Sequence, residues 1–463
     1  MAFNYTDRSS HVDIVKNPDV SGFLGECQYM VTPTGKELAE IASNFCDIPI
    51  SERELPTMVI AIDGSNFEAS VNPEIPFTRV GFVKLSNVLV DRTRFKTLGT
   101  GRFVDPFKVA QLSKDNSTIT FTFPSSNISY KGEENVRDGF RRALDEALYK
   151  HRVSDADAKT SLRSTLFYLA SLRSGEMNSG AINKLLLHKC PNCGAEKIEV
   201  LDIPETQKCP HCGKKVYPSD CLRIWEEVSD SASNQMALTR FTNAVVHMLM
   251  IHYIRCVKDS FPETYLSVLN NTCFFIDGSL SINGNAAWLK SSIMKCLYDL
   301  NEELKSRGLP PMLVIGLQNH GKLVDYVRLI KDAIRPNSIL AVSDEFRNEY
   351  VDYDRTPSNT TYGNETYYGQ DFLLKTTSGK TFVFDVPYPF PNKDNIGTFK
   401  VEKANIANYP NIGDYVRLIE DFESDLSENA LVPVALARKY STINLQPGGK
   451  ILDLLARNIV TGN

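Results

Sequence analysis

The order of apolar and polar residues predicts strands and helices along most of this 463-residue chain. The first apolar run, MVIAIDGSNFEASV from Met58, is rich in β-branched residues and reaches an Asp-Gly-Ser turn signal, which is typical of a buried strand that ends there. Strand-like runs at 80–90 and 118–123 follow, and three strands in succession suggest a meander. Between 133 and 151 apolar residues recur every four positions, which predicts a helix.

Strand and helix patterns alternate in the second half of the chain. The segments NNTCFFIDGSLSING and PPMLVIGLQN predict strands, and helical patterns follow them at 286–306 and 322–334. This alternation favours parallel βα units, whose functional groups gather at the carboxyl ends of the strands. Further expected elements are helices at 35–45, 158–172 and 233–257, a long ordered loop at 351–371, strands at 371–376 and 380–386, and a C-terminal helix pair.

Composition and charge exclude several classes of protein. Charged residues make up 23% and hydrophobic residues 42% of the chain, so it is neither a disordered tail nor a fibre. The net charge of −5 is unusual for a protein that holds nucleic acid by bulk charge. The most apolar window, 244–257, contains His247, His252 and Arg255 and is too short to span a bilayer. We expect no membrane span and no secretory signal, and therefore a cytoplasmic protein.

Four of the ten cysteines form two Cys-Pro-x-Cys-Gly pairs, at Cys190 and Cys193 and at Cys209 and Cys212. Each such turn directs two thiolates at one point, and two turns complete a tetrahedral zinc site with no open position. The pattern therefore predicts a structural zinc ribbon that binds Zn²⁺. A redox role is disfavoured because one pair would suffice for it.

The tetrapeptide Ile-Asp-Gly-Ser occurs twice, with Asp63 and Asp277, each time directly after a strand-like run. Carboxylates at the ends of neighbouring strands can bridge hard divalent cations, and two such ions can clamp both the attacking and the leaving oxygen of a phosphodiester. The alternative is that Asp-Gly is a common turn pair that merely closes each strand.

Several segments together resemble the NurA nucleases: AIDGSNFEASV, FFIDGSLS, VIGLQNHGKLVDY, YGQDFLLKTTSGKTFVFDVPY and PVALARKYSTI, in order between about residues 58 and 455. The resemblance implies an α/β fold with an RNase H-like (PIWI-like) mixed sheet core flanked by helices. It also implies that Asp63 and Asp277 bind catalytic Mn²⁺ or Mg²⁺. On this basis we divide the chain into an N-terminal extension (1–56), two parts of the core (57–186 and 218–463) and the inserted zinc ribbon (187–217).

At two positions the chain departs from the pattern of the family. A family glutamate is expected on a helix before the second aspartate strand, but Val246 and His247 stand there, and the nearest acids upstream are Glu226 and Glu227. Where the family has a C-terminal histidine, this chain has Arg438. A guanidinium cannot bind a metal or act as a base near neutral pH, although it can hold phosphate.

Two more residues are candidates for the same site. Asp385, at the end of the FVFDVPY run, would replace a missing acid or else be a structural or exposed aspartate. His320 follows the VIGLQN run and is expected near the carboxyl ends of the strands.

The leading hypothesis is a metal-dependent deoxyribonuclease that acts by a two-metal carboxylate mechanism. The resemblance implies a homodimer that receives DNA from a HerA-like hexameric ATPase, in DNA repair or in defence against phage. One rival is a catalytically degenerate DNA-binding adaptor of such an ATPase, and another is a PIWI-type guide-binding protein, for which no guide-end pocket is recognisable. A net acidic subunit needs only a local basic lining, and its candidates are residues 92–102, Arg438 and four ribbon lysines: Lys189, Lys208, Lys214 and Lys215.

Overall fold

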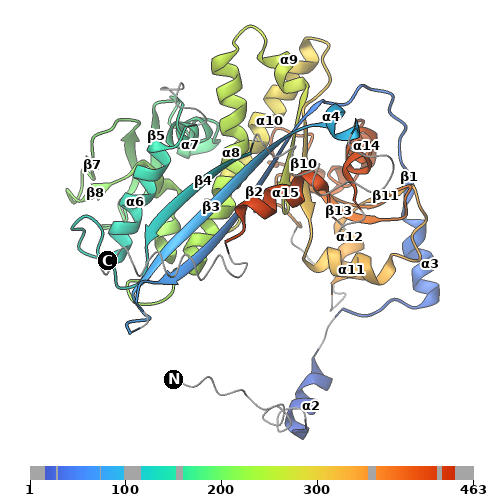
Figure 1. The fold of residues 1–463 in the computed structure, drawn as a ribbon, viewed down its shortest axis with the longest axis horizontal. Coiled ribbons are helices and arrows are strands. Elements are labelled where there is room, and N and C mark those ends of the chain that lie inside the picture. The colour runs from blue at the N-terminus through green and yellow to red at the C-terminus, as the bar shows by residue number, and fades with distance from the viewer. Residues whose placement is uncertain are drawn as a thin grey trace.

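The computed structural model describes residues 16–27, 30–72, 74–97, 116–152, 160–352, 361–424 and 430–443. Its central feature is a nine-stranded sheet in the order β1-β11-β12-β13-β10-β9-β2-β3-β4, and the long β2, β3 and β4 form one wing of it in Figure 1. The strands are β1 (Cys46–Asp47), β2 (Met58–Ser70), β3 (Arg79–Asp91), β4 (Asn116–Pro124), β9 (Thr272–Asp277), β10 (Leu313–Gln318), β11 (Ser338–Ala341), β12 (Gly369–Lys375) and β13 (Thr381–Pro387).

The centre of the sheet is parallel and both of its wings are antiparallel. β9 pairs in parallel with β2 on one side and with β10 on the other. The helix α10 (Leu289–Ser306) connects β9 to β10, which is the βα unit that the sequence predicts. β2, β3 and β4 form the predicted antiparallel meander, and β13, β12 and β11 continue the sheet antiparallel beyond β10. The expected mixed sheet is therefore confirmed.

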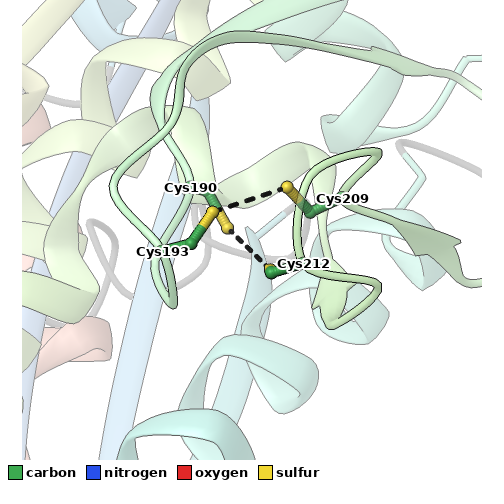
Figure 2. A group of neighbouring side chains, drawn as sticks. All are labelled: Cys190, Cys193, Cys209 and Cys212. Carbon is green, nitrogen blue, oxygen red and sulfur yellow. Dashed lines mark hydrogen bonds between the residues drawn. The ribbon is translucent and has the colours of Figure 1, made fainter.

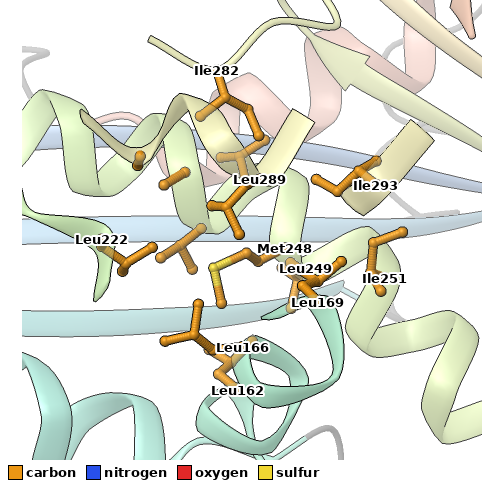
Figure 3. Close-up of a cluster of buried hydrophobic side chains, with 14 of the residues drawn as sticks. Leu162, Leu166, Leu169, Leu222, Met248, Leu249, Ile251, Ile282, Leu289 and Ile293 are labelled. Atoms are coloured by element: carbon orange, nitrogen blue, oxygen red, sulfur yellow. The ribbon is translucent and has the colours of Figure 1, made fainter. Parts of the chain in front are cut away.

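Helices cover both faces of this sheet. Residues of α6, α7, α8 and α10 pack on one face, and Figure 3 shows part of that core, where α7, α8 and α10 meet. The helices α14 and α15 cover the opposite face. The other described helices and their bounds are α2 (Pro18–Glu26), α3 (Gly35–Ser43), α4 (Arg92–Thr97), α6 (Val136–Lys150), α7 (Leu162–Ser171), α8 (Gln235–Ser260), α9 (Tyr265–Asn270), α11 (Lys322–Ile330), α12 (Asp344–Phe346), α13 (Ile396–Glu402), α14 (Ile412–Phe422) and α15 (Val432–Ser441).

The long helix α8 lies directly against β2 and β3 because both strands have a glycine where the helix crosses them. A Cβ atom on Gly64 would come within 2.9 Å of side-chain atoms of Leu85, Thr242 and Val246. A Cβ atom on Gly81 would come within 2.7 Å of Leu238. A side chain at Gly64 would thus push α8 off the sheet immediately behind Asp63, whereas Gly81 lies opposite Glu68, five residues farther along β2.

The most apolar window of the sequence lies inside α8, where most side chains are buried against the sheet and the neighbouring helices. This agrees with the predicted buried helix. Within the described ranges, no helix has both the length and the apolar character that crossing a bilayer requires.

The first predicted strand does not end at its Asp-Gly-Ser. β2 continues to Ser70, so Asp63 lies in the middle of the strand. The reason is the second partner: β3 pairs with β2 from Met58 to Ser70, whereas the parallel pairing with β9 ends at Ile62 and Ile276. The antiparallel neighbour therefore keeps the backbone extended beyond the point where the parallel neighbour ends.

The basic segment at 91–103 is also not a loop throughout. Residues 92–97 form α4, because the Asp91 carboxylate accepts hydrogen bonds from the backbone amides of Thr93 and Arg94 at the start of the helix. Residues 98–103 of the predicted loop lie outside the described part of the chain. Two further differences are that the helix expected at 322–334 ends at Ile330, and that the edge strand β1 and its neighbour β11 are short and have no clear sequence signal.

Candidate functional site

The two repeated aspartates meet on one face of the sheet. Ile62 and Ile276, the residues before them, are partners in the parallel pairing of β2 and β9. Both isoleucines belong to the core on the α8 side, and side chains alternate along a strand, so Asp63 and Asp277 point to the other face, where α15 lies. The sequence prediction that these carboxylates lie on neighbouring strands is therefore satisfied by the geometry.

The helix α15 supplies two direct partners of the carboxylates. Arg438 forms a bidentate ion pair with Asp277, in which Nε lies 2.7 Å from Oδ2 and Nη2 lies 2.6 Å from Oδ1. The Ser441 hydroxyl donates a hydrogen bond to Oδ2 of Asp63. The residue that replaces the family histidine is thus in contact with the second aspartate.

The position of α15 is set by hydrogen bonds to the strands beneath it. The Ser65 hydroxyl donates to the backbone carbonyl of Ser441, and the Ser86 hydroxyl, which is fully buried, donates to that of Ala437, both at 2.5 Å. Ala437 is itself fully buried in the core between α15 and the sheet. Arg438 and Ser441 therefore project from a helix that is fixed over the middle of β2 and the end of β9.

A fifth side chain reaches the site from the loop after β10. The Asn319 amide donates a hydrogen bond of 3.1 Å to Oδ1 of Asp277. Neither Asn319 nor Ser441 is predicted as a site residue by the sequence patterns above. The available signals were that Asn319 follows a parallel strand next to β9, and that Ser441 lies in the ARKYSTI segment that resembles the family.

The electrostatics of the site favour a bound cation. Burial, followed by the negative charge of Asp277, raises the pKa of Asp63 to about 6, while Ser441 and Arg438 act in the opposite direction. The Asp277 side chain is 7% exposed and that of Arg438 is 47% exposed, so the guanidinium forms the solvent-facing side of the pair. Two partly buried carboxylates with an amide nearby are the oxygen donors that Mn²⁺ and Mg²⁺ prefer, and the residues present therefore fit a divalent metal.

Glu226 and Glu227, the candidates for the helix acid, have other partners. They lie on the short 3-10 turn η5 (Ile224–Glu227), which precedes α8. Glu226 forms ion pairs with Lys189 and Arg223, and Glu227 lies 3.4 Å from Arg240. These contacts hold both glutamates on the α8 side of the molecule, so neither provides a third carboxylate beside Asp63 and Asp277.

The position where the family glutamate is expected lies on α8, across the sheet from α15. His247 is buried there, and its Nδ1 lies 2.7 Å from the Tyr368 hydroxyl. Burial lowers the pKa of His247 to about 4, which keeps the ring neutral at physiological pH. This residue is thus a neutral packing residue of the core.

Asp385 is structural. It is fully buried and pairs in register with Gly316 on the face opposite Asp277. Its carboxylate accepts hydrogen bonds of 2.6 Å from the Leu280 amide and from the Gln318 side chain. Asp385 thereby holds the turn that follows Asp277, which agrees with the structural alternative. His320 is exposed, one residue beyond Asn319.

The four predicted zinc ligands converge (Figure 2). Cys190, Cys193, Cys209 and Cys212 all place their sulfur atoms within 4.8 Å of one another, and none is in a disulfide. The two knuckles repeat the same backbone geometry, since the amides of Gly194 and Gly213 donate to the carbonyls of the first cysteine of their own pair. Four convergent thiol groups fit a tetrahedral Zn²⁺, so the cysteine cluster is compatible with the predicted ribbon.

Two small hairpins carry this cluster outside the main sheet: β5 (Lys184–Lys189) with β6 (Glu196–Leu201), and β7 (Gln207–Lys208) with β8 (Lys215–Val216). Leu185, Leu187, Ile198 and Val200 of the first hairpin are buried in the same core as α6 and α8. The ribbon is therefore packed against the main body of the protein.

Most of the candidate basic lining is paired with acids. Arg92 and Lys96 both contact Asp421. Three of the four ribbon lysines form ion pairs as well, Lys189 with Glu226, Lys214 with Glu134 and Lys215 with Glu133.

Two comparisons with known proteins find similarities to this chain. The sequence profile of the NurA domain matches residues 58–352. Among solved structures, the crystal structure of the NurA nuclease from Sulfolobus solfataricus is similar, with 9% sequence identity, a TM-score of 0.38, and coverage of 99% of this chain and 98% of that one. No curated protein sequence is detectably similar to this chain. Because the NurA profile spans more than half of the 463 residues, this chain belongs to the NurA domain family.

Proposed function

We propose that this protein is a metal-dependent deoxyribonuclease whose catalytic centre is formed by Asp63 and Asp277. The observation that carries the proposal is the meeting of these carboxylates, 214 residues apart in sequence, on one face of the sheet under Arg438. Membership of the NurA domain family supports the same reaction class.

A divalent cation held by these carboxylates, Mn²⁺ or Mg²⁺, would supply an activated water and neutralise charge that develops on the phosphate. The residues of the chain have separate tasks. Asp63 and Asp277 provide the oxygen ligands, and Ser441 and Asn319 orient them through hydrogen bonds. Arg438 presents further N–H groups to a phosphodiester that enters from solvent.

We further propose that the nuclease works with a HerA-like hexameric ATPase that delivers DNA, as a homodimer, in DNA end processing or in defence against phage. The charge distribution supports a partner, because the chain is net acidic and most of its candidate basic lining is already ion-paired. A subunit of this kind has little free positive potential with which to collect DNA on its own.

The test is a cleavage assay on linear DNA with Mn²⁺ or Mg²⁺, with and without the ATPase. We expect Asp63→Asn and Asp277→Asn to abolish cleavage while the melting temperature stays that of a folded protein, because each removes an anionic metal ligand at constant size. The matched control is Asp299→Asn, an exposed aspartate of α10 that pairs with Lys295. Cleavage by both site variants at the wild-type rate would contradict the assignment.

The same assay addresses the adaptor alternative. Arg438 already neutralises Asp277, which is the specific observation that favours a degenerate site. If the wild-type protein binds no Mn²⁺ in a calorimetric titration and cuts no DNA with the ATPase present, the adaptor function replaces the nuclease.

A further inference from the structure

The bidentate contact of Arg438 with Asp277 limits what else Asp277 can bind. Both carboxylate oxygens already accept a charge-assisted hydrogen bond, at 2.6 and 2.7 Å, and Oδ1 accepts another from Asn319. Paired, parallel contacts of this kind are among the strongest that a carboxylate makes with a side chain. Oδ1 thus accepts two hydrogen bonds and Oδ2 accepts one, so Oδ2 keeps a lone pair for one cation shared with Asp63. A second cation at Asp277 must first displace the guanidinium.

Arg438 is also held in place by its own helix. The backbone carbonyls of Ala437 and Ser441, on either side of it, accept hydrogen bonds from Ser86 of β3 and Ser65 of β2. The backbone of α15 around Arg438 is thus attached to β2 and β3, and β2 is the strand that carries Asp63. The ion pair joins α15 to the end of β9, both of which have fixed positions, so the arginine is a structural component of the site.

The charges at the site balance with one divalent ion and leave an excess with two. The two carboxylates carry two negative charges and Arg438 carries one positive charge. One divalent cation and one phosphodiester anion bring the total to zero. A second divalent ion would leave two uncompensated positive charges in a partly buried site, where charge imbalance is costly.

We propose that Arg438 takes the place of one of the two metal ions that the repeated Asp-Gly-Ser motif predicts, so that the site binds a single divalent cation. The inference rests on the proposed nuclease function and specifies its metal content. A guanidinium has five N–H donors, of which Nε and one on Nη2 contact Asp277, so three are left for the phosphate. The solvent-facing half of the side chain presents them where DNA would approach.

The experiment counts Mn²⁺ ions on the full-length, zinc-loaded protein by calorimetry and by electron paramagnetic resonance of free manganese. We expect one Mn²⁺ per chain for the wild type, and no site-bound Mn²⁺ for Asp63→Asn. We expect Arg438→Gln to bind two, because the released oxygens of Asp277 become available. Arg438→Lys keeps the positive charge and is expected to keep a count of one.

The matched control is Arg328→Gln, an exposed arginine of α11 paired with Asp325, which should leave the count at one. Two ions on the wild type, or a single ion on a folded Arg438→Gln protein, would overturn the proposal. Neither result depends on cleavage, so both can occur in an active nuclease. No bound Mn²⁺ at all would instead contradict the proposed function itself.

Discussion

At the scale of single residues, the sheet has carboxylates on both faces, and their surroundings give them different tasks. Asp63 and Asp277 are next to α15 and partly open to solvent through Arg438. Asp371 and Asp385 lie on the other face, where both are buried and share the amide of Gln318. Asp371 is paired with Arg347. The donors to Asp385 within the described residues are neutral, namely the Leu280 amide and the Gln318 side chain.

Asp385 makes one contribution to the pH dependence of stability. Burial raises its pKa to about 7, against 3.8 for an unperturbed aspartate. Between these values the folded protein binds the proton and the unfolded chain does not, so this group makes stability fall as pH rises through that window. Asparagine binds no proton in this window, so we expect Asp385→Asn to make the slope of unfolding free energy against pH less negative, by the equivalent of about one bound proton. Urea unfolding at a series of pH values measures the slope.

The control for this measurement is Asp299→Asn on the exposed surface, which should leave the slope unchanged. An identical slope for Asp385→Asn and wild type would show that Asp385 is ionised in the folded protein throughout the range.

At the scale of elements, contacts of α6 attach the second cysteine knuckle to the main body of the protein. Arg141 of α6 forms a buried bidentate ion pair with Asp220, at 2.6 and 2.7 Å, and donates to the carbonyl of Lys215 in β8. A buried arginine that loses its partners is strongly destabilising. The geometry of the knuckles is therefore coupled to the packing of the main core.

We expect removal of zinc to destabilise the whole chain. Cys209→Ser removes one of the four ligands, and we expect this variant to lose the bound zinc. The free energy of unfolding should fall by about several kcal/mol, because binding of a structural metal contributes directly to folding, and the melting temperature should fall with it. Metal analysis and thermal unfolding measure the two effects. Cys46→Ser is the control, since Cys46 is exposed and outside the cluster. A Cys209→Ser protein that melts like wild type would mean that the ribbon is an independent appendage.

At the scale of the whole molecule, the net charge of −5 is combined with ion pairing of most lysines and arginines of the candidate basic lining. Long-range attraction of a polyanion depends on the summed charge, so the isolated protein has little of it. DNA would reach Asp63 and Asp277 more efficiently when a partner holds it.

We therefore expect weak DNA binding by the isolated protein, with a Kd no tighter than about 10⁻⁶ M at physiological salt, in the range of non-specific binding. Fluorescence anisotropy with a labelled duplex measures this Kd. Cleavage should rise at least about tenfold when a HerA-like ATPase is added, because electrostatic steering of DNA by a partner changes association rates by this amount or more. Nanomolar binding without the ATPase at the same salt concentration would contradict this expectation.

The sequence by itself determined the features that depend on short-range pattern. Apolar periodicity located most strands and helices, because burial of one face imposes a period of two or 3.6 residues. The zinc cysteines were recognisable because each knuckle is a local turn. Asp63 and Asp277 were recognisable because each follows an apolar run in the same tetrapeptide.

Only the tertiary structure decided which residues complete the candidate site. Ser441 and Arg438 contact aspartates that lie 378 and 161 residues away, and no local pattern encodes contacts across such distances. The continuation of β2 past Asp63 depended on its pairing with β3, and the exclusion of Glu226, Glu227 and Asp385 depended on which face of the sheet each occupies. Strand order and helix placement set these relations, and both arise from packing of the whole chain.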